Sequence, residues 1–551
     1  MSQNEPAKRA KDGSPRRKPG VGGKCDGRAR EAGERTATLE FFRPLRGLKM
    51  AAFLALALLP LPSCSHPAPP GTLVMLIESS PTDLDPRVGM DAQSERIDEL
   101  LFDPLLSRDE NFNLHPWLAE RWEIPDPLTY VFHLRHDVHF HDGRPLGARD
   151  VKWTVESTLH GGLHTTKASS YRFIDHIDTP DEFTVVFRLK EPDSGLLWNV
   201  SGGAIGIVPY GSGADFNRHP IGSGPFRFVS QEQDKEVIVD RNDGYWGAKP
   251  HVAQVRFAVV PDDTTRALEL RKGSADIAIN ALTADTVVAM RRDHALKIEI
   301  APGTIYTYLA MNLRDPILKD VRVRQALACA IDRQPIIHYL WRDMARPAAS
   351  VLPPQHWAYN PHVRTYEYSP QRARQLLDAA GYPERNGIRF HLTMETSIQE
   401  STKLLAAVLQ QQFRAVGIAL DIRSFEFATF YADVTKGAFQ LYSLRWIGGN
   451  ENPEIFEDVF HSARFPPEGD NRGYYSNPQV DELINQARRT VDKEQRRRLY
   501  AQVQQIVAED LPYINLWYLD NVLVHTARVS NLPLSPSGDY DFLREAKISN
   551  K

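Results

Sequence analysis

The chain has 551 residues, of which 42% are hydrophobic and 25% are charged. This composition is typical of a soluble globular protein and excludes a collagen-like, disulfide-dense or wholly disordered chain. The length predicts two or three domains. The first 49 residues carry an excess of seven positive charges, whereas the chain from Cys64 onward carries an excess of eleven negative charges. Because an acidic surface repels phosphate, the charge argues against nucleic acid as a partner.

A short apolar segment, residues 51–62 (AAFLALALLPLP), follows a basic stretch near the start of the chain. It is too short to span about 30 Å of hydrocarbon, which requires roughly 20 residues. The pattern instead predicts a signal peptide within a leader, residues 1–63, that is removed. The sequence LPSC, ending at Cys64, resembles the bacterial lipobox, whose cysteine receives the lipid. An ordinary signal peptide followed by a free cysteine is the alternative.

The three cysteines, Cys25, Cys64 and Cys329, are far apart in the sequence. Their spacing supports neither a disulfide framework nor a metal clip. Cys25 lies in the leader. We expect Cys329, which lies in the apolar pattern QALACAI, to be a buried small hydrophobic residue.

After the leader, strand and helix signals alternate along the chain. Apolar runs predict strands at residues 72–77, 129–134, 184–189, 237–239, 255–259 and 419–422. Helical spacing predicts helices at residues 147–160, 264–272, 371–380, 404–416, 480–489 and 499–507. Ser369-Pro370 and Asn477-Pro478 are typical helix starts, and Gly273 and Gly417 are typical helix ends. The alternation predicts an α/β fold with open sheets.

The sequence contains none of the common catalytic motifs. A nucleophile elbow, a zinc-peptidase helix, a phosphate-binding loop and a dinucleotide fingerprint are all missing. We therefore assign no catalytic residue and no cofactor, and we expect a protein that is not an enzyme. A secreted hydrolase or peptidase on an α/β scaffold is the alternative class, and the sequence offers no nucleophile or metal for it.

A run of histidines precedes the Asp142-Gly143 turn. On a strand, His139 and His141 would share one face, and neutral imidazoles bind nickel, copper or zinc. No cysteine or glutamate completes a set of ligands nearby. We interpret the run as a solvated strand edge, and a metal site at His139 and His141 remains the alternative.

Five long segments carry motifs in a fixed order: residues 118–155 (beginning LAERWEIPDPLTYVFHL), 221–246 (IGSGPF to RNDGYW), 261–277 (PDDTTRALELRKGSADI), 308–332 (YLAMNL to ACAID) and 474–512 (YYSNPQVDELI to AEDLP). They are similar to the corresponding blocks of the bacterial extracellular solute-binding proteins of the dipeptide, oligopeptide and nickel class. Those proteins are the receptor components of ABC importers. The resemblance covers essentially the whole chain after Cys64.

The resemblance implies an α/β fold of two lobes, the Venus-flytrap fold of periplasmic binding proteins, with an inserted subdomain. Lobe I would comprise residues 64–115, 216–308 and 518–551. The inserted subdomain would comprise residues 116–215, and lobe II residues 309–517. Hinge closure between the lobes would bury the ligand.

The resemblance also implies the partners and the location. We expect a monomer in the periplasm or at the cell surface, tethered by a lipid on Cys64, that captures peptides or peptide-like solutes. It would deliver them to an ABC permease in the cytoplasmic membrane. A receptor for nickel, a metal chelate or another specialised solute is the alternative within the same family.

In peptide receptors of this class, an aspartate three residues after a tryptophan pairs with the α-ammonium group of the peptide. In residues 445–453 (RWIGGNENP) that position is Gly449. Either Glu451 replaces the aspartate, or Arg445 binds the carboxylate or phosphate of an anionic ligand. The candidate ligand-binding residues are Arg445, Trp446, Gly449, Asn450, Glu451 and Trp357.

Overall fold

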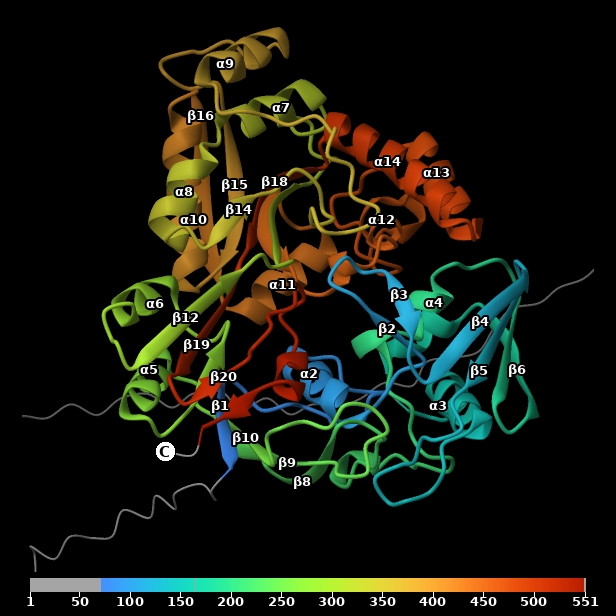
Figure 1. Cartoon of the computed structure of the whole chain (residues 1–551). Helices are drawn as coiled ribbons and strands as arrows, with labels where there is room; N and C mark the ends of the chain where they lie inside the picture. Colours follow the sequence, from blue (N-terminus) through green and yellow to red (C-terminus); the bar gives the residue numbers. More distant parts are fainter. Residues whose placement is uncertain (1–70, 164, 550–551) are drawn as a thin grey trace, which may run out of the picture. The chain divides into compact units, whose positions relative to one another are not determined.

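The structure, a computed structural model, describes residues 71–163 and 165–549. The predicted signal peptide and Cys64 lie outside these residues. Across the described ranges, no helix is long and apolar enough to cross a membrane. The strands gather in three main sheets, each with helices packed against it (Figure 1).

The first sheet has seven strands in the order β12-β19-β11-β1-β10-β9-β8. Their bounds are β1 Thr72–Ile77, β8 Phe226–Glu232, β9 Glu236–Arg241, β10 Gln254–Val259, β11 Ile277–Ile279, β12 Leu296–Ala301 and β19 Asn521–Thr526. β1 is parallel to β10 and β11, whereas β9 and β19 are antiparallel to their neighbours. Helices α2 (Ala92–Leu101), α5 (Asp263–Lys272) and α6 (Ala284–Met290) belong to the same region. The buried side chains of Leu73, Met75 and Ile77 pack in one core with Ile97 and Leu101 of α2.

The second sheet has six strands in the order β14-β18-β13-β17-β15-β16. Their bounds are β13 Tyr306–Met311, β14 Ala345–Pro347, β15 Phe390–Ser397, β16 Ile418–Phe425, β17 Leu441–Trp446 and β18 Tyr513–Leu519. The helices of this part are α7 Val321–Ala330, α8 Arg333–Trp341, α9 Pro370–Ala379, α10 Glu400–Arg414, α11 Phe427–Lys436, α12 Ile455–Phe460, α13 Pro478–Arg489 and α14 Lys493–Asp510. α10 and α11 pack against β15 and β16.

The third sheet is antiparallel, in the order β4-β5-β7-β6, and α3 packs against β6 and β7. Its elements are β4 Ala119–Asp126, β5 Thr129–Leu134, α3 Ala148–His160, β6 Ile174–Asp181, β7 Thr184–Leu189 and α4 Leu196–Asn199. Two short ribbons complete the sheets: β2 (Leu106–Arg108) with β3 (Leu114–Pro116), and β20 (Val529–Ser530) with β21 (Lys547–Ile548).

Local sequence signals explain where several helices begin and end. The side chain of Asn477 accepts a hydrogen bond from the backbone N–H of Gln479 at the start of α13. Gly273 ends α5 with a φ of 73°, in the left-handed region that favours glycine. The predicted helices and strands are therefore confirmed, with ends that differ by a few residues, and Cys329 is buried and free as expected.

The stretches of chain that supply each sheet can be compared with the proposed lobe borders. The first sheet draws its strands from three separate stretches, and the third lies within residues 116–215. β13 begins at Tyr306 and β18 ends at Leu519, so the proposed borders of lobe II at residues 309 and 517 fall inside strands. Secondary structure therefore favours moving those two borders by two or three residues.

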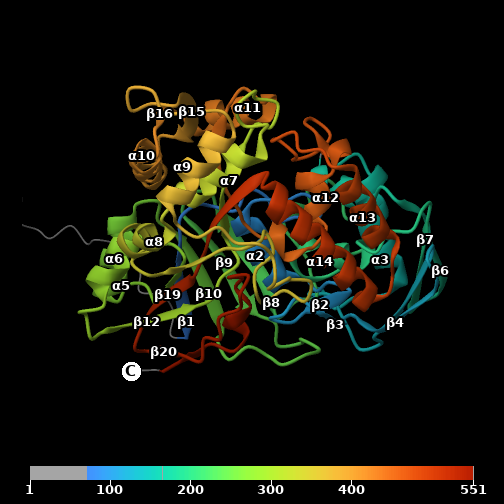
Figure 2. The same ribbon diagram turned by 90° about the horizontal axis from the view of Figure 1, so that it is seen from above.

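A buried ion network joins the inserted subdomain to α12 and α13 of lobe II. Glu457 accepts hydrogen bonds from Arg464, and its carboxylate lies 3.2 Å from Arg488 Nη1 and 3.4 Å from Arg172 Nη2. Arg172 belongs to the inserted subdomain, and the backbone N–H of Ser194 in the same subdomain donates to the Arg488 carbonyl at 2.9 Å. Figure 2 shows α12 and α13 beside the edge of the third sheet. These contacts join residues 172–194 directly to α12 and α13.

Candidate ligand-binding site

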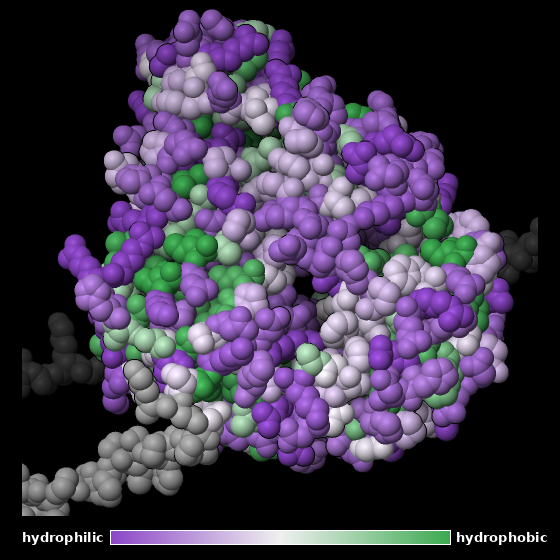
Figure 3. Space-filling view, viewed as in Figure 1, coloured by the Kyte–Doolittle hydropathy of each residue, from purple (hydrophilic) through white to green (hydrophobic). Residues whose placement is uncertain are grey.

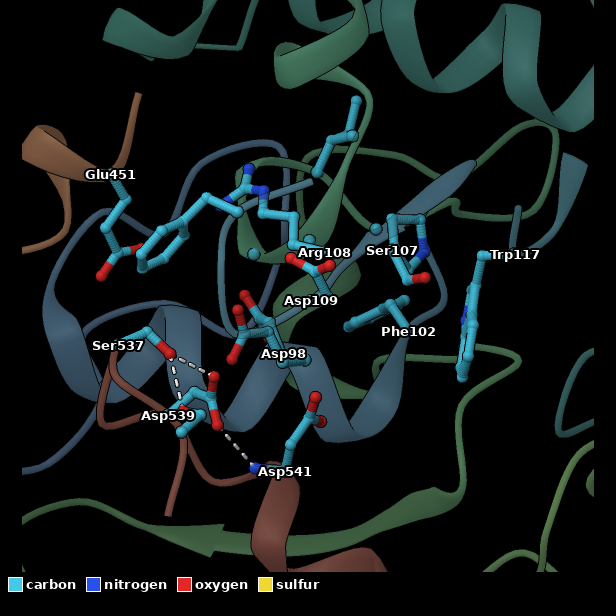
Figure 4. Close-up of a pocket in the computed structure, with 18 of the residues that line it drawn as sticks. Asp98, Phe102, Ser107, Arg108, Asp109, Trp117, Glu451, Ser537, Asp539 and Asp541 are labelled. Atoms are coloured by element: carbon cyan, nitrogen blue, oxygen red, sulfur yellow. Dashed lines mark hydrogen bonds between the residues drawn. The ribbon is translucent and has the colours of Figure 1, made fainter. Parts of the chain in front are cut away.

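A cavity of about 260 Å³ lies where lobe I, the inserted subdomain and lobe II meet. Figure 3 shows the surface hollowed near the middle of this face, and Figure 4 shows the side chains that line the cavity. Most of the wall is formed by α2, the β2–β3 ribbon, the segment before β21, and Gly202, Gly203, Ile205 and Gly206. Glu451 is the lining residue that lobe II contributes.

Glu451 lies at the end of a short 3₁₀ helix, η4 (Gly449–Glu451), and is 6% exposed. Its Oε1 accepts a hydrogen bond from Thr304 Oγ1 at 2.9 Å, and its backbone carbonyl accepts one from His356 Nε2 at 3.0 Å. Burial raises the pKa of Glu451 to about 7, against the opposing effect of the Arg108 charge. The carboxylate is therefore held rigidly at the cavity and is close to half ionised at neutral pH.

The residues beside Glu451 shape the turn rather than the cavity wall. Asn450 is fully buried, and its Nδ2 donates to the carbonyls of Thr304 at 2.8 Å and Val351 at 3.1 Å. A Cβ placed on Gly449 would meet no atom closer than 3.4 Å. The backbone therefore has room for a Cβ at position 449, where the resemblance implies an aspartate.

The other candidates from the sequence lie outside the cavity wall. The exposed Arg445 guanidinium is 5.0 Å from the centre of the Trp341 ring. Trp446 stacks with Tyr308, with 6.5 Å between ring centres, and packs against the core of lobe II. Trp357 packs against the same core and lies beneath Lys493. Of the six candidates, the structure brings Glu451 alone to the cavity.

Arg108, at the end of β2, is a cavity residue that the sequence analysis missed. Its guanidinium lies 3.6 Å from the centre of the Trp198 ring, and it donates to Ser201 Oγ at 2.9 Å and to the Ser201 carbonyl at 2.5 Å. Burial lowers the pKa of Arg108 to about 10, and the nearby Glu451 carboxylate opposes that shift. The two side chains lie on the same cavity wall with no ion pair within 4.0 Å between them.

Acidic side chains dominate the cavity wall. Two arginines, Arg108 and Arg544, face seven carboxylates: Asp98, Glu99, Asp109, Glu110, Glu451, Asp539 and Asp541. Six of these acids were not predicted from the sequence, because they come from two stretches, residues 98–110 and 539–541, that are more than 400 positions apart. One signal was present, since Asp98 interrupts the apolar face that Ile97 and Leu101 continue on α2.

The histidine run does not form a metal site in the described part of the chain. His141 Nδ1 accepts from the Gly222 N–H at 3.2 Å, and Nε2 donates to the Gly224 carbonyl at 3.1 Å. Both ring nitrogens of His141 are thus used structurally, while His139 is exposed. Among the residues described, no group of three histidine, cysteine, aspartate or glutamate side chains is placed to hold a metal ion.

The raised pKa of Glu451 predicts a pH-dependent cost in stability. The folded state keeps a proton that the unfolded state, with an ordinary pKa near 4.5, releases, so stability falls as pH rises from about 4.5 to about 7. We expect Glu451→Gln to have a free energy of unfolding up to about 3 kcal/mol larger than that of wild type at pH 8. The variant should therefore unfold at a higher temperature than wild type at that pH. At pH 4.5 the two should unfold alike. Thermal unfolding at both pH values checks this, and equal midpoints at pH 8 would contradict it.

Comparison with known proteins agrees with the fold. Residues 113–465 match the bacterial extracellular solute-binding proteins, family 5 Middle. Probable di/tripeptide-binding protein 5 of Pseudomonas aeruginosa is 29% identical over 91% of this chain and 99% of its own length. The oligopeptide-binding protein AppA of Bacillus subtilis, solved with a nonapeptide, is 26% identical, with a TM-score of 0.72 over 87% of this chain and 99% of AppA. NikZ of Campylobacter jejuni, solved with Ni(L-His), is 26% identical, with a TM-score of 0.74 over 87% of this chain and all of NikZ.

The chain therefore belongs to the bacterial extracellular solute-binding proteins of family 5. Both the resemblance found in the sequence and the predicted two-lobe α/β fold are confirmed. The protein is a solute receptor of the kind that serves ABC importers.

Proposed function

We propose that this receptor captures short peptides and that Glu451 binds their α-ammonium group. The observation that carries the proposal is the position of Glu451, a buried carboxylate on the cavity wall two residues after the glycine that replaces the expected aspartate. Its Oε2 has no hydrogen-bond partner among the described residues, which leaves that oxygen for a ligand. An ammonium group needs such a partner when it leaves water.

The size and charge of the cavity support this choice of ligand. A volume of about 260 Å³ lies just below the range of about 300–1,000 Å³ typical of small-molecule sites, which favours a di- or tripeptide over a long peptide. The excess of carboxylates opposes an anionic ligand, and Arg445 lies outside the wall. Among the described residues, no group of three histidine, cysteine, aspartate or glutamate side chains is placed to hold a nickel ion.

Delivery of the bound ligand to the membrane is also part of the proposed function. The receptor acts as a monomer without catalytic activity and hands its ligand to a permease of the cytoplasmic membrane. A lipid on Cys64 tethers it in the periplasm or at the cell surface. Stable anchoring requires more than one acyl chain. The family membership supports delivery to a permease, whereas the lipid is supported by the LPSC sequence alone.

The test compares a free peptide with its N-acetylated form. We expect Ala-Ala to bind the wild-type chain from Ser65 onward and N-acetyl-Ala-Ala to bind at least about 50-fold more weakly, because acetylation removes the ammonium charge that Glu451 would pair with. Isothermal titration calorimetry at pH 7.5 measures both affinities. Equal binding of the two peptides would contradict an ammonium anchor.

A further inference from the structure

Most acidic side chains of the cavity wall have no cationic side chain within 4.0 Å in the described part of the chain. Within the described ranges, Asp109 Oδ2 lies 3.1 Å from His115 Nε2, and Asp541 forms an ion pair with Arg544. No ion pair within 4.0 Å is present in the described part for the other five: Asp98, Glu99, Glu110, Glu451 and Asp539. A single ammonium group at Glu451 would leave these other acidic side chains without a cationic partner.

Among these residues, Asp98 departs furthest from the rule that buried polar groups form hydrogen bonds. It is 5% exposed, it lines the cavity, and neither carboxylate oxygen has a hydrogen-bond partner in the described structure. The next residue, Glu99, likewise leaves its buried Oε2 without a partner. Figure 4 shows Asp98 of α2 near Asp539 and Asp541, which belong to the segment before β21. Glu451 comes from a third segment. Buried polar atoms are nearly always satisfied, so these oxygens indicate a missing partner.

The basic side chains near this group are engaged elsewhere. Arg544 Nε donates to Asp541 Oδ1 at 2.8 Å, and its Nη2 donates to the Glu99 carbonyl at 3.1 Å. Lys167 Nζ donates to the Pro86 carbonyl at 2.9 Å. Arg108 is held by Ser201 and the Trp198 ring, as described above. The chain therefore supplies no cation that directly contacts the Asp98 carboxylate in the part that the structure describes.

We propose that Asp98 and Glu99 form a second cation-binding subsite, so that the receptor selects peptides carrying a lysine or arginine side chain in addition to the α-ammonium group. This inference rests on the proposed function, since it requires the first ammonium group to lie at Glu451. A buried carboxylate without a counter-ion is costly, and a cationic side chain removes that cost only when it is bound. Burial raises the pKa of both Asp98 and Glu99 well above the ordinary range, which favours the protonated form in the empty site, and a bound cation would favour the ionised form instead.

The test uses two dipeptides that differ by one charge. Norleucine-alanine has nearly the same apolar stem as Lys-Ala but lacks the side-chain ammonium group. We expect wild type to bind Lys-Ala at least about tenfold more tightly than norleucine-alanine, measured by calorimetry at pH 7.5. In Asp98→Asn, which keeps the shape of the side chain, the ratio of the two affinities should fall below about threefold.

Two further variants provide a second readout and a control. Glu99→Gln should also reduce the ratio, and it replaces Asp98→Asn as the readout if that variant fails to fold. Glu95→Gln removes a carboxylate from the same helix that is not part of the cavity wall and faces Lys167, so the ratio should stay near its wild-type value.

Each outcome supports or overturns a defined part of the account. Equal affinities of wild type for Lys-Ala and norleucine-alanine would overturn the second subsite while leaving peptide binding intact. Failure of both dipeptides to bind would overturn the proposed function itself. A third probe, 1,5-diaminopentane, carries two charges without a peptide. If it binds as tightly as Lys-Ala, the ligand class is a free diamine rather than a peptide.

Discussion

Glu451→Gln should weaken the binding of Ala-Ala roughly 100-fold. The substitution keeps the shape of the side chain and its hydrogen bond from Thr304, but it removes the negative charge that faces the ligand ammonium group. Truncating one partner of a buried charge pair costs about 2–5 kcal/mol, and every 1.4 kcal/mol corresponds to about a tenfold change in affinity. Calorimetry on wild type and variant measures the loss.

Arg445→Ala is the control that separates the two hypotheses drawn from the sequence. Because Arg445 is exposed and lies over Trp341 outside the cavity wall, its removal should change the affinity by less than about threefold. The opposite pattern, in which Arg445→Ala abolishes binding and Glu451→Gln leaves it intact, would support an anionic ligand and would contradict the proposed role of Glu451.

Glu457→Gln should lower the free energy of unfolding by roughly 3 kcal/mol, since removing one member of a buried ion network leaves the others uncompensated. Glu457 is 7% exposed and faces Arg464, Arg488 and Arg172. Burial alone would raise the pKa of Glu457, but these arginines hold it below its ordinary value. Urea unfolding monitored by circular dichroism checks this prediction.

The matched control for this network is Glu482→Gln, on the exposed side of α13. Glu482 accepts a hydrogen bond from Gln486 at the surface and has no ion pair among the residues described. Surface substitutions of this kind usually change stability by less than about 0.5 kcal/mol. If both variants unfold at the same urea concentration, the network around Glu457 contributes no more than an ordinary surface pair.

Local signals in the sequence predicted much of the fold. The strand at residues 72–77 was evident because both of its faces are buried, which leaves a continuous apolar run. The N-cap of α13 was evident because Asn477 and Pro478 act on the helix through neighbouring atoms. Order along the chain also carried the family resemblance, since several long motifs recur in sequence.

Most residues of the cavity could not be predicted from the sequence, because they come from distant parts of the chain. Asp98 and Asp539 are 441 positions apart in the numbering, and their proximity depends on the return of the chain to the first sheet. Glu451 became a candidate because it lies two residues from position 449, where the resemblance implies an aspartate. Trp446 and Arg445 lie three and four residues from the same position, but both belong to β17 and lie outside the cavity wall.

The most direct test of the account is a crystal structure of the chain from Ser65 onward with Lys-Ala bound. It should place the peptide α-ammonium nitrogen within hydrogen-bond distance, about 3 Å, of a Glu451 carboxylate oxygen, with the lysine ammonium beside Asp98 and Glu99. An α-ammonium group bound away from Glu451, or a peptide held outside the cavity, would contradict the central claim.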